Sequence, residues 1–252
     1  MKNVTSETMR KFGLLGKNIS YSFSKTYFNK KFQKLELDAT YENFDLSKIE
    51  DFKHVLKENN NLEGLNVTIP YKEQIMPFLD SLHPVASEIG AVNTIKVSET
   101  GQLTGYNTDY FGFTESITPF LKKQHKKAVI LGTGGASKAV AYSLKSLGIS
   151  FCYVSRKPSK NAIPYTQLSE EILKEYLVVI NCTPLGTSPK TAEFPAIPVE
   201  HLSRQHLVYD LIYNPAETRL MKLASERGAT TVNGLRMLEL QAERAWEIWN
   251  ES

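Results

Sequence analysis

A glycine turn between an apolar strand and a helix is the feature that most constrains the fold of this chain. Gly132-Thr133-Gly134-Gly135-Ala136 follows the apolar run 128–131, and a helical pattern over 137–147 comes directly after it. Glycine lets the backbone turn tightly and approach a ligand closely, and the N–H groups at the start of the helix favour an anion. The arrangement is typical of a dinucleotide-binding βαβ unit, although Ser137 stands at the third glycine position of the common pattern. Purely structural turns of this kind also occur, so the turn by itself leaves both interpretations open.

Short apolar runs alternate with helical patterns along the rest of the chain. We expect further strands over 12–16, 41–44, 65–69, 151–155, 177–180 and 207–211, and helices over 46–57, 110–123 and 235–249. Another helix follows Ser24, its expected N-cap, because Phe28, Phe32 and Leu35 recur there at helical spacing. Residues 91–106 are typical of a β-hairpin that turns at 99–101. Strands that alternate with helices predict an α/β fold with largely parallel sheets, in two lobes.

The end of the strand after the glycine turn indicates which dinucleotide would bind. An NAD site usually has an acidic residue there for the ribose 2′-hydroxyl. This chain instead has Ser155-Arg156-Lys157, with Lys160 close behind. Cations in place of an acid suit the 2′-phosphate of NADP, and a planar guanidinium can stack on the adenine. We therefore expect NADP as the cofactor, with a basic surface loop as the alternative interpretation.

Composition excludes several classes of protein. The 252 residues include 30 basic and 27 acidic side chains, and a net charge of +3 is too small for a nucleic-acid-binding surface. No apolar run approaches the roughly 20 residues needed to cross a membrane, and residues 1–10 are polar, unlike a signal peptide. Cys152 and Cys182 have no metal-ligand spacing and are typical of reduced thiols. We expect a cytoplasmic protein with no metal, membrane or nucleic-acid partner.

Polar side chains gather near the ends of the strands in the first part of the chain. They are Ser22, Ser24, Asn66, Thr68, Lys72, Asn93, Asn107 and Asp109. Hydroxyl groups suit a carboxylate and amides suit ring oxygens, so this set would fit a small polyhydroxylated acid. Such a substrate must meet the nicotinamide, and pockets of this kind favour domain interfaces and sheet switch points.

The motifs of the first lobe resemble those of the shikimate dehydrogenase family. The family's G-x-P-I-x-H-S-x-S-P-x-x-H-N aligns with residues 16–29, where Gly16, Ile19, Ser22, Ser24 and Asn29 agree. At Asn18, Tyr21, Lys25 and Phe28 the chain departs from the family's Pro, His, Pro and His. The motifs N-V-T-x-P-x-K, G-A-V-N-T and G-x-N-T-D-x-x-G match 66–72, 90–94 and 105–112.

The resemblance continues to about residue 249, with the motifs in the family's order. G-x-G-G-A matches 132–136, and Ser155-Arg156-Lys157 stands where the family usually has Asn-Arg-Thr. N-x-T-P-x-G matches 181–186, D-x-x-Y-x-P matches 210–215, and G-x-x-M-L-x-x-Q-A matches 234–242. Eight motifs in order are hard to produce by chance.

The resemblance implies NADPH-dependent reduction of 3-dehydroshikimate to shikimate, a step toward chorismate and the aromatic amino acids. The catalytic pair it implies is Lys72 and Asp109, and the implied substrate contacts are Ser22, Ser24, Thr68, Asn93, Tyr213 and Gln241. The implied cofactor contacts are Gly132, Thr133, Gly134, Gly135, Ala136, Ser155, Arg156, Lys157, Leu211 and Gly234. An ammonium at the carbonyl oxygen can stabilise the developing negative charge and deliver the proton, which suits Lys72.

The resemblance also implies the division of the chain. Residues 1–106 would form the substrate-binding and catalytic domain, and 107–234 a Rossmann-type NADP-binding domain. The C-terminal helix, within 235–252, would return to the N-terminal lobe, with Trp246 and Trp249 as packing residues. Two alternatives stay open: a quinate or dual quinate/shikimate dehydrogenase, and a non-catalytic NADP-binding relative. The oligomeric state also stays open, between monomer and homodimer.

Overall fold

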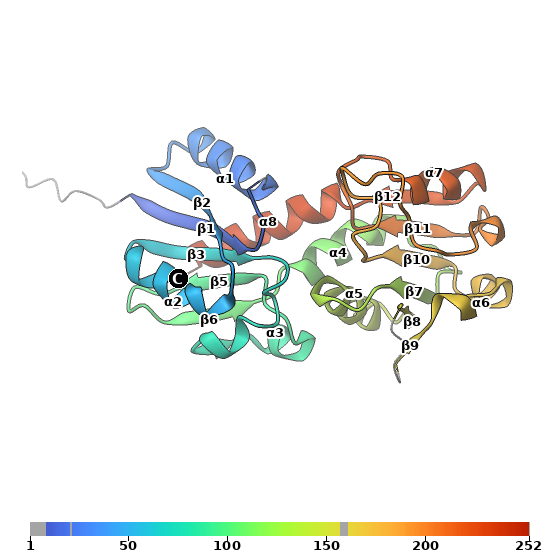
Figure 1. The fold of residues 1–252 in the computed structure, drawn as a ribbon, viewed down its shortest axis with the longest axis horizontal. Coiled ribbons are helices and arrows are strands. Elements are labelled where there is room, and N and C mark those ends of the chain that lie inside the picture. The colour runs from blue at the N-terminus through green and yellow to red at the C-terminus, as the bar shows by residue number, and fades with distance from the viewer. Residues whose placement is uncertain (1–8, 21, 157–160, 252) are drawn as a thin grey trace, which may run out of the picture. The chain divides into compact units, whose positions relative to one another are not determined.

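The computed structural model describes residues 9–20, 22–156 and 161–251, and the chain divides into two compact units. Unit 1 comprises residues 1–108 and 245–252, and unit 2 comprises residues 109–244. Each unit is built on one six-stranded sheet that carries its own helices (Figure 1). The predicted α/β class with two lobes is therefore confirmed.

Unit 1 contains a mixed sheet with the strand order β2-β1-β3-β5-β6-β4. Its strands are β1 (Arg10–Gly16), β2 (Ala39–Asp45), β3 (Leu62–Val67), β4 (Ser81–Leu82), β5 (Thr94–Val97) and β6 (Leu103–Tyr106). Its helices are α1 (Phe23–Lys34), α2 (Phe52–Glu58) and α3 (Pro84–Ile89), with short 3-10 turns η1 (Ile49–Asp51) and η2 (Met76–Phe78). Strands β2, β1 and β3 are parallel, whereas β5 pairs antiparallel with both β3 and β6. The predicted hairpin is thus present, and because it joins β3 antiparallel, the sheet is mixed, with three of its five strand pairings parallel.

The two faces of the unit 1 sheet carry different cores. Leu15 and Leu65 pack with Phe52 of α2 in a core of mainly aliphatic side chains. On the other face, aromatic rings of α1 stack on the strands, with Phe28 and Phe32 against Tyr41 and Phe12 respectively. Side chains alternate between the faces of a strand, so each strand supplies both cores.

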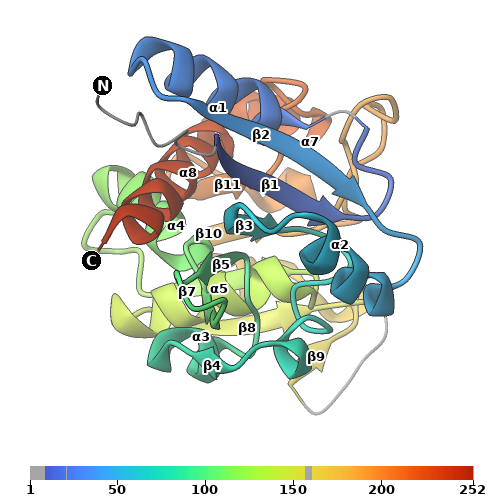
Figure 2. The ribbon, with the colours of Figure 1, turned by 90° about the vertical axis from the view of Figure 1, so that its left-hand side faces the viewer.

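Helix α8 (Leu235–Asn250) begins in unit 2 and ends in unit 1, where its last two turns pack beside α1 (Figure 2). Trp249 is buried and donates a hydrogen bond from Nε1 to the Ile95 carbonyl oxygen at 3.0 Å. A Cβ at Gly64 would lie 2.3 Å from the Trp249 Nε1 atom, so glycine is required for this close approach. The predicted return of the C-terminal helix, with its tryptophans as packing residues, is confirmed.

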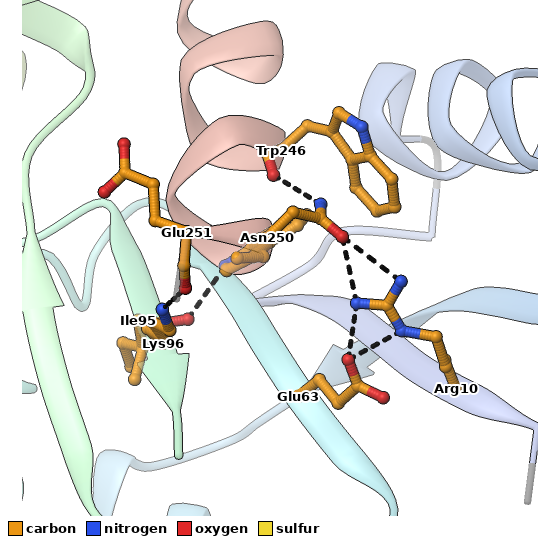
Figure 3. Close-up of polar contacts among 8 residues, drawn as sticks. Arg10, Glu63, Ile95, Lys96, Trp246, Asn250 and Glu251 are labelled. Carbon is orange, nitrogen blue, oxygen red and sulfur yellow. Dashed lines mark hydrogen bonds and ion pairs between the residues drawn. The ribbon is translucent and has the colours of Figure 1, made fainter. Parts of the chain in front are cut away.

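Polar contacts fix the end of α8 to the neighbouring strands (Figure 3). Arg10 forms an ion pair with Glu63 at 2.6 Å and donates two hydrogen bonds to Asn250 Oδ1 at 3.2 Å. The Arg10 guanidinium also lies 5.6 Å from the centroid of the Trp246 ring, within cation–π range. The Lys96 ammonium, on β5, contacts the backbone oxygen of Glu251. The end of α8 is therefore held by polar and charged groups as well as by aromatic packing.

Unit 2 contains a parallel sheet with the order β12-β11-β10-β7-β8-β9. Its strands are β7 (Lys127–Leu131), β8 (Ser150–Val154), β9 (Ala162–Ile163), β10 (Val178–Asn181), β11 (Leu207–Asp210) and β12 (Thr230–Asn233). Its helices are α4 (Asp109–Ile117), α5 (Gly135–Ser146), α6 (Glu170–Glu175) and α7 (Arg219–Glu226), with 3-10 turns η3 (Thr118–Phe120), η4 (Tyr165–Gln167) and η5 (Val199–His201). This is the strand order of a Rossmann fold, in which the direction of winding reverses between the first and fourth strands, here β7 and β10.

Both faces of this sheet are buried, as is usual for parallel strands. Ile130 packs with Phe113 of α4 and Val140 of α5, whereas Val129 packs on the opposite face with Leu173 of α6 and Leu220 of α7. The continuous apolar run 128–131 follows from this two-sided burial.

Some element boundaries differ from the sequence expectations for local reasons. The helix expected over 110–123 is α-helical only to Ile117, because Pro119 cannot continue the backbone hydrogen bonding. The N-cap of α1 is Ser22, and the expectation that Ser24 caps it is wrong because Ser24 lies inside the first turn. The sequence expectations omit strands β4 and β9 and helices α3 and α6, each of which is short, and strand β12, which lacks the continuous apolar run of β10 and β11. They also omit helix α7, although its buried residues Leu220, Met221 and Ala224 recur at helical spacing. No helix of the described part of the chain is long and apolar enough to span a membrane.

Candidate functional site

In unit 1 the loop between β1 and α1 is fixed by the Asp45 carboxylate. Asp45 accepts hydrogen bonds from the backbone N–H groups of Asn18 at 2.8 Å and Ile19 at 3.1 Å. Asn18 has a φ of 57°, a left-handed conformation that asparagine tolerates better than most residues. The departure from the family's Pro at this position therefore changes how the loop is built. The departure at Tyr21 lies outside the described residues.

Ser22 and Ser24 sit at the start of α1 in different environments. The Ser22 hydroxyl oxygen accepts a hydrogen bond from the Lys25 N–H at 3.3 Å and so caps the helix. Ser24 is buried two residues further on. Phe28, where the family has His, is fully buried and stacks on Tyr41 with a centroid distance of 4.8 Å. On α1, the Phe28 ring thus makes an aromatic packing contact where the family has a polar histidine.

Thr68 and Lys72 follow the carboxyl end of β3. The Thr68 N–H bonds the Leu15 carbonyl oxygen at 2.8 Å, and a Cβ at Gly16 would lie 2.5 Å from Thr68 Cγ2. The carbonyl oxygen of Lys72 accepts a hydrogen bond from the Val92 N–H at 2.7 Å, which ties its loop to the segment that leads into Asn93. Lys72 is half-buried. Three of the predicted residues, Thr68, Lys72 and Asn93, are therefore positioned by neighbouring backbone segments.

Asn93 belongs to a buried hydrogen-bond network of side chains. Asn93 Oδ1 accepts from the Thr108 N–H at 2.6 Å and from Thr94 Oγ1 at 3.1 Å. Its Nδ2 donates to Thr108 Oγ1 at 3.0 Å. Asn66 joins the same network through Thr94 Oγ1 at 3.3 Å. Each of these residues is buried, so the network holds Asn93 in one orientation.

In unit 2 the glycine turn lies directly after β7, at the point where the winding of the sheet reverses. Gly132 has a φ of +100°, and its added Cβ would lie 3.2 Å from Thr183 Cγ2, just after β10. Gly134 is the N-cap of α5, and an added Cβ there would meet no atom within 4 Å. Ser137, at the third glycine position, is buried and donates from its hydroxyl to the Gly134 carbonyl oxygen at 2.6 Å. The backbone conformation therefore requires glycine at 132, whereas protein packing leaves open space at 134.

The remaining residues of the turn, together with Ser155 and Arg156, lie at the carboxyl ends of the adjacent parallel strands β7 and β8. Thr133 is exposed, and Gly135 and Ala136 form the first turn of α5. Ser155 follows β8, donates its N–H to the Ile163 carbonyl oxygen at 3.0 Å and is half-buried. Arg156 is exposed, and Lys157 lies outside the described residues. A phosphate cradle at 132–136 and a cation after the next strand together fit an NADP molecule.

Leu211 and Gly234 meet at the carboxyl ends of β11 and β12. An added Cβ at Gly234 would lie 2.0 Å from the Leu211 carbonyl oxygen, so only glycine allows this contact. Tyr213, two residues beyond Leu211, is 38% exposed, and partial burial raises the pKa of its phenol. The predicted nicotinamide-lining pair is thus brought together by the backbone.

Asp109 and Gln241 lie on two helices of unit 2 that pack closely. Asp109 opens α4 and is buried, and its charge contributes to the raised pKa of the Cys182 thiol, for which burial is the main cause. Gln241 is buried on α8 and donates from Nε2 to the Leu238 carbonyl oxygen at 2.9 Å. Gly112 of α4 allows the approach, because its added Cβ would lie 2.5 Å from the Met237 carbonyl oxygen.

Asn181 and Asp210 form a buried pair for which the sequence analysis assigned no role. Asn181 Nδ2 donates to Asp210 Oδ1 at 3.0 Å, and the carboxylate also accepts from the Ile212 N–H at 3.1 Å and Thr218 Oγ1 at 2.7 Å. Burial raises the pKa of Asp210 to about 6. Both residues end neighbouring strands and both occur in the matched motifs, which is the signal that could have identified them. Among the described residues, no group of three or more His, Cys, Asp or Glu side chains could hold a metal ion.

Comparison with known proteins identifies relatives along nearly the whole chain. Residues 14–95 match the family model of the shikimate dehydrogenase substrate binding domain. A protein from Clostridium botulinum (strain Hall), named shikimate dehydrogenase (NADP(+)), is 39% identical over 248 residues, which are 94% of this chain and 95% of the relative.

Solved structures share the fold. The crystal structure of a shikimate 5-dehydrogenase from Thermus thermophilus, in complex with NADP(H) and shikimate, matches with a TM-score of 0.85 and 31% identity, covering 96% of this chain and 94% of that one. A quinate dehydrogenase from Corynebacterium glutamicum, in complex with NAD, matches with a TM-score of 0.85 and 27% identity, covering 96% and 93%. The likeness therefore extends over both units.

Proposed function

The chain belongs to the shikimate dehydrogenase family, and we propose that it catalyses the reversible NADPH-dependent reduction of 3-dehydroshikimate to shikimate, in the pathway to chorismate and the aromatic amino acids. Over 94% of its length the chain is 39% identical to the relative from Clostridium botulinum, and the family's motifs are present in both units. The relative from Clostridium botulinum carries the NADP(+)-dependent name, and the enzyme from Thermus thermophilus was solved with NADP(H) and shikimate.

The glycine turn is the observation that carries the cofactor proposal. Gly132 is required by the backbone conformation, but at Gly134 no protein atom lies within 4 Å of an added Cβ. The open space at the N-terminus of α5 therefore supports close approach of a pyrophosphate, which the N–H groups and the helix dipole would stabilise. Arg156, exposed at the end of the next strand, would contact the 2′-phosphate.

NADPH supplies the hydride when it is bound, so the protein must orient the ketone and supply the proton. Lys72 carries an ammonium group that would donate the proton to the forming alkoxide and stabilise its charge, and it would take the proton back in the reverse reaction. Asp109 is the second member of the proposed pair and would hold that ammonium in place. Leu211 and Gly234 would line the nicotinamide site.

Six polar side chains are the proposed contacts of the substrate. The hydroxyl groups of Ser22 and Ser24 would bind the carboxylate. Thr68 and Asn93, with Tyr213 and Gln241, would bind the ring hydroxyls, since hydroxyl and amide groups can both donate and accept hydrogen bonds. The buried network around Asn93 supports this, because a fixed amide loses little entropy on binding.

Quinate dehydrogenase activity is the nearest alternative, because a quinate dehydrogenase shares the fold at 27% identity. The presence of Arg156, with no acidic residue at 155–157, favours NADP over NAD. A non-catalytic relative is disfavoured by the presence of both Lys72 and Asp109, since a binding protein has no need of a proton-transfer pair. The cytoplasmic location and the choice between monomer and homodimer stay predictions.

Steady-state kinetics with four pairs of reactants test the proposal. The purified protein is assayed with shikimate and with quinate, each with NADP and with NAD, and the formation of reduced cofactor is followed by absorbance. We expect the highest kcat/KM for shikimate with NADP. A higher kcat/KM for quinate would support the alternative enzyme, and cofactor binding without turnover of either substrate would support the non-catalytic relative.

A further inference from the structure

We propose that Tyr41 is a positioning residue for substrate binding, which acts through Asn66 and Thr94 on the amide group of Asn93. The inference rests on the proposed function, in which Asn93 contacts the substrate. Tyr41 lies on β2 and belongs to none of the motifs that the sequence analysis matched to the family.

The Tyr41 side chain is fully buried, and its hydroxyl donates to Asn66 Oδ1 at 2.8 Å. Its ring is stacked on Phe28, with an interplanar angle of 12°, and lies 6.4 Å from the Trp249 ring. Burial raises the pKa of the phenol well above its usual value, and a hydrogen bond with Ser24 opposes this only in part, so the hydroxyl keeps its proton at neutral pH. Phe28, which departs from the family pattern, supplies the apolar cover for this donor.

The Asn66 amide has its orientation set from both ends. Its Nδ2 atom donates to the Asn93 carbonyl oxygen at 3.4 Å and to Thr94 Oγ1 at 3.3 Å, so the Oδ1 atom must point the other way. That oxygen then needs a donor in a buried site, and the Tyr41 hydroxyl provides it. Without the hydroxyl, the amide would lose the partner that opposes its rotation.

Thr94 passes this orientation to Asn93. Thr94 Oγ1 accepts from Asn66 and donates to Asn93 Oδ1 at 3.1 Å. Hydrogen bonds that run in one direction strengthen one another, so a change at one end weakens those further along. The Asn93 amide is the last group in this series of hydrogen bonds, and the proposed function places it against the substrate.

Tyr41→Phe removes the hydroxyl and retains the ring, and Tyr209→Phe is its matched control. Tyr209 is also fully buried, stacks edge-on with Phe113 at 5.1 Å, and shares a hydrogen bond of 2.6 Å with Ser116 in unit 2. Tyr41→Phe removes the buried hydrogen bonds with Asn66 and Ser24, and Tyr209→Phe removes the one with Ser116, so Tm should fall in both variants. Only Tyr41→Phe should raise the KM for shikimate, by about five- to tenfold, because such a bond contributes about 1 kcal/mol. Its KM for NADP and its kcat should change less than about twofold.

Thr94→Val interrupts the same series of hydrogen bonds without changing Tyr41. It also provides the test if Tyr41→Phe does not fold. Valine keeps the shape of threonine but removes the hydroxyl that joins Asn66 to Asn93. We expect the same selective rise in the KM for shikimate. Because both changes interrupt one path, the double variant should show less than the product of the two single effects.

The inference is overturned if Tyr41→Phe folds and keeps the wild-type KM for shikimate, or if Tyr209→Phe raises that KM equally. It is also overturned if the effects of Tyr41→Phe and Thr94→Val multiply fully. The wild-type protein separates this failure from a failure of the proposed function. If it does not turn over shikimate, the proposed function fails, and if it does, an unchanged KM in the variants contradicts only the role of Tyr41.

Discussion

Asn181 and Asp210 are joined by a hydrogen bond of 3.0 Å from Nδ2 to Oδ1 at the carboxyl ends of β10 and β11. The same Asp210 carboxylate caps the backbone at Ile212 and receives the hydroxyl of Thr218, the N-cap of α7. One buried acid thus organises the loops that follow two neighbouring strands. Leu211, which we propose lines the nicotinamide site, lies directly within the loop that it organises.

The raised pKa of Asp210 predicts a pH-dependent contribution to stability. Its pKa is about 6 in the folded protein because of burial, against about 3.9 in an unfolded chain. The folded state therefore binds the proton more tightly, and this contribution to stability is present below about pH 4 and is lost as the pH rises through about 6. Relative to Asp210→Asn, the wild-type protein should lose about 2–3 kcal/mol of unfolding free energy between about pH 4 and pH 7. Denaturant unfolding at several pH values measures this, and a constant difference between the two proteins would contradict it.

Gly134→Ala should separate cofactor binding from folding. An added methyl group meets no protein atom, and the backbone φ of −81° suits alanine, so Tm should change little. The KM for NADPH should rise at least about tenfold, because the methyl group would occupy the space that we assign to the pyrophosphate.

Gly148→Ala, in the loop after α5, is the matched control and should have the opposite effects on Tm and on the KM for NADPH. No atom lies near an added Cβ there either, but the φ of +68° is strained for alanine. This variant should lower Tm and leave the KM for NADPH unchanged. An unchanged KM in Gly134→Ala would contradict a role of the turn in cofactor binding.

Arg156→Ala should reduce the preference for NADPH over NADH. The guanidinium is proposed to pair with the 2′-phosphate, which NADH lacks, whereas its stacking on the adenine is common to both cofactors. Binding of NADPH should therefore weaken about tenfold or more, and that of NADH should weaken much less. Arg227→Ala, also exposed in unit 2, controls for the loss of one positive charge. Fluorescence titration with both cofactors measures the difference, and equal weakening for both would refute the assignment.

Lys72→Ala should remove the proton donor without removing the binding site. We expect kcat to fall by several orders of magnitude with a modest change in the KM for shikimate, because the ammonium acts mainly in the transition state. Lys57→Ala, an exposed lysine of the same unit, controls for the charge. A Lys72→Ala enzyme with a near-normal kcat would exclude Lys72 from the proposed mechanism.

The sequence predicted the features that depend on local pattern. The glycine turn, the apolar strand before it and the β5–β6 hairpin all follow from residues close together in the chain, and all are present. Ser24 was mistaken for the cap of α1 because both serines suit a cap, and only the backbone shows that Ser22 has the extended conformation that a cap needs.

Contacts between residues far apart in the chain could not be predicted from the sequence. Asn181 and Asp210 are 29 positions apart, and Tyr41 and Asn66 are 25 apart, so nothing local indicates that either pair meets. Helix α3 is too short for its periodicity to be distinguished from that of a loop, and strand β12 lacks the continuous apolar run that marks β10 and β11. The roles of these residues depend on strand order, which no single segment encodes.

The most direct test of the proposed function is the formation of NADPH from NADP and shikimate by the purified protein, followed by its absorbance. We expect continuous turnover that requires both reactants and falls by orders of magnitude in Lys72→Ala. No NADPH formation by a folded wild-type protein that binds NADP would contradict it.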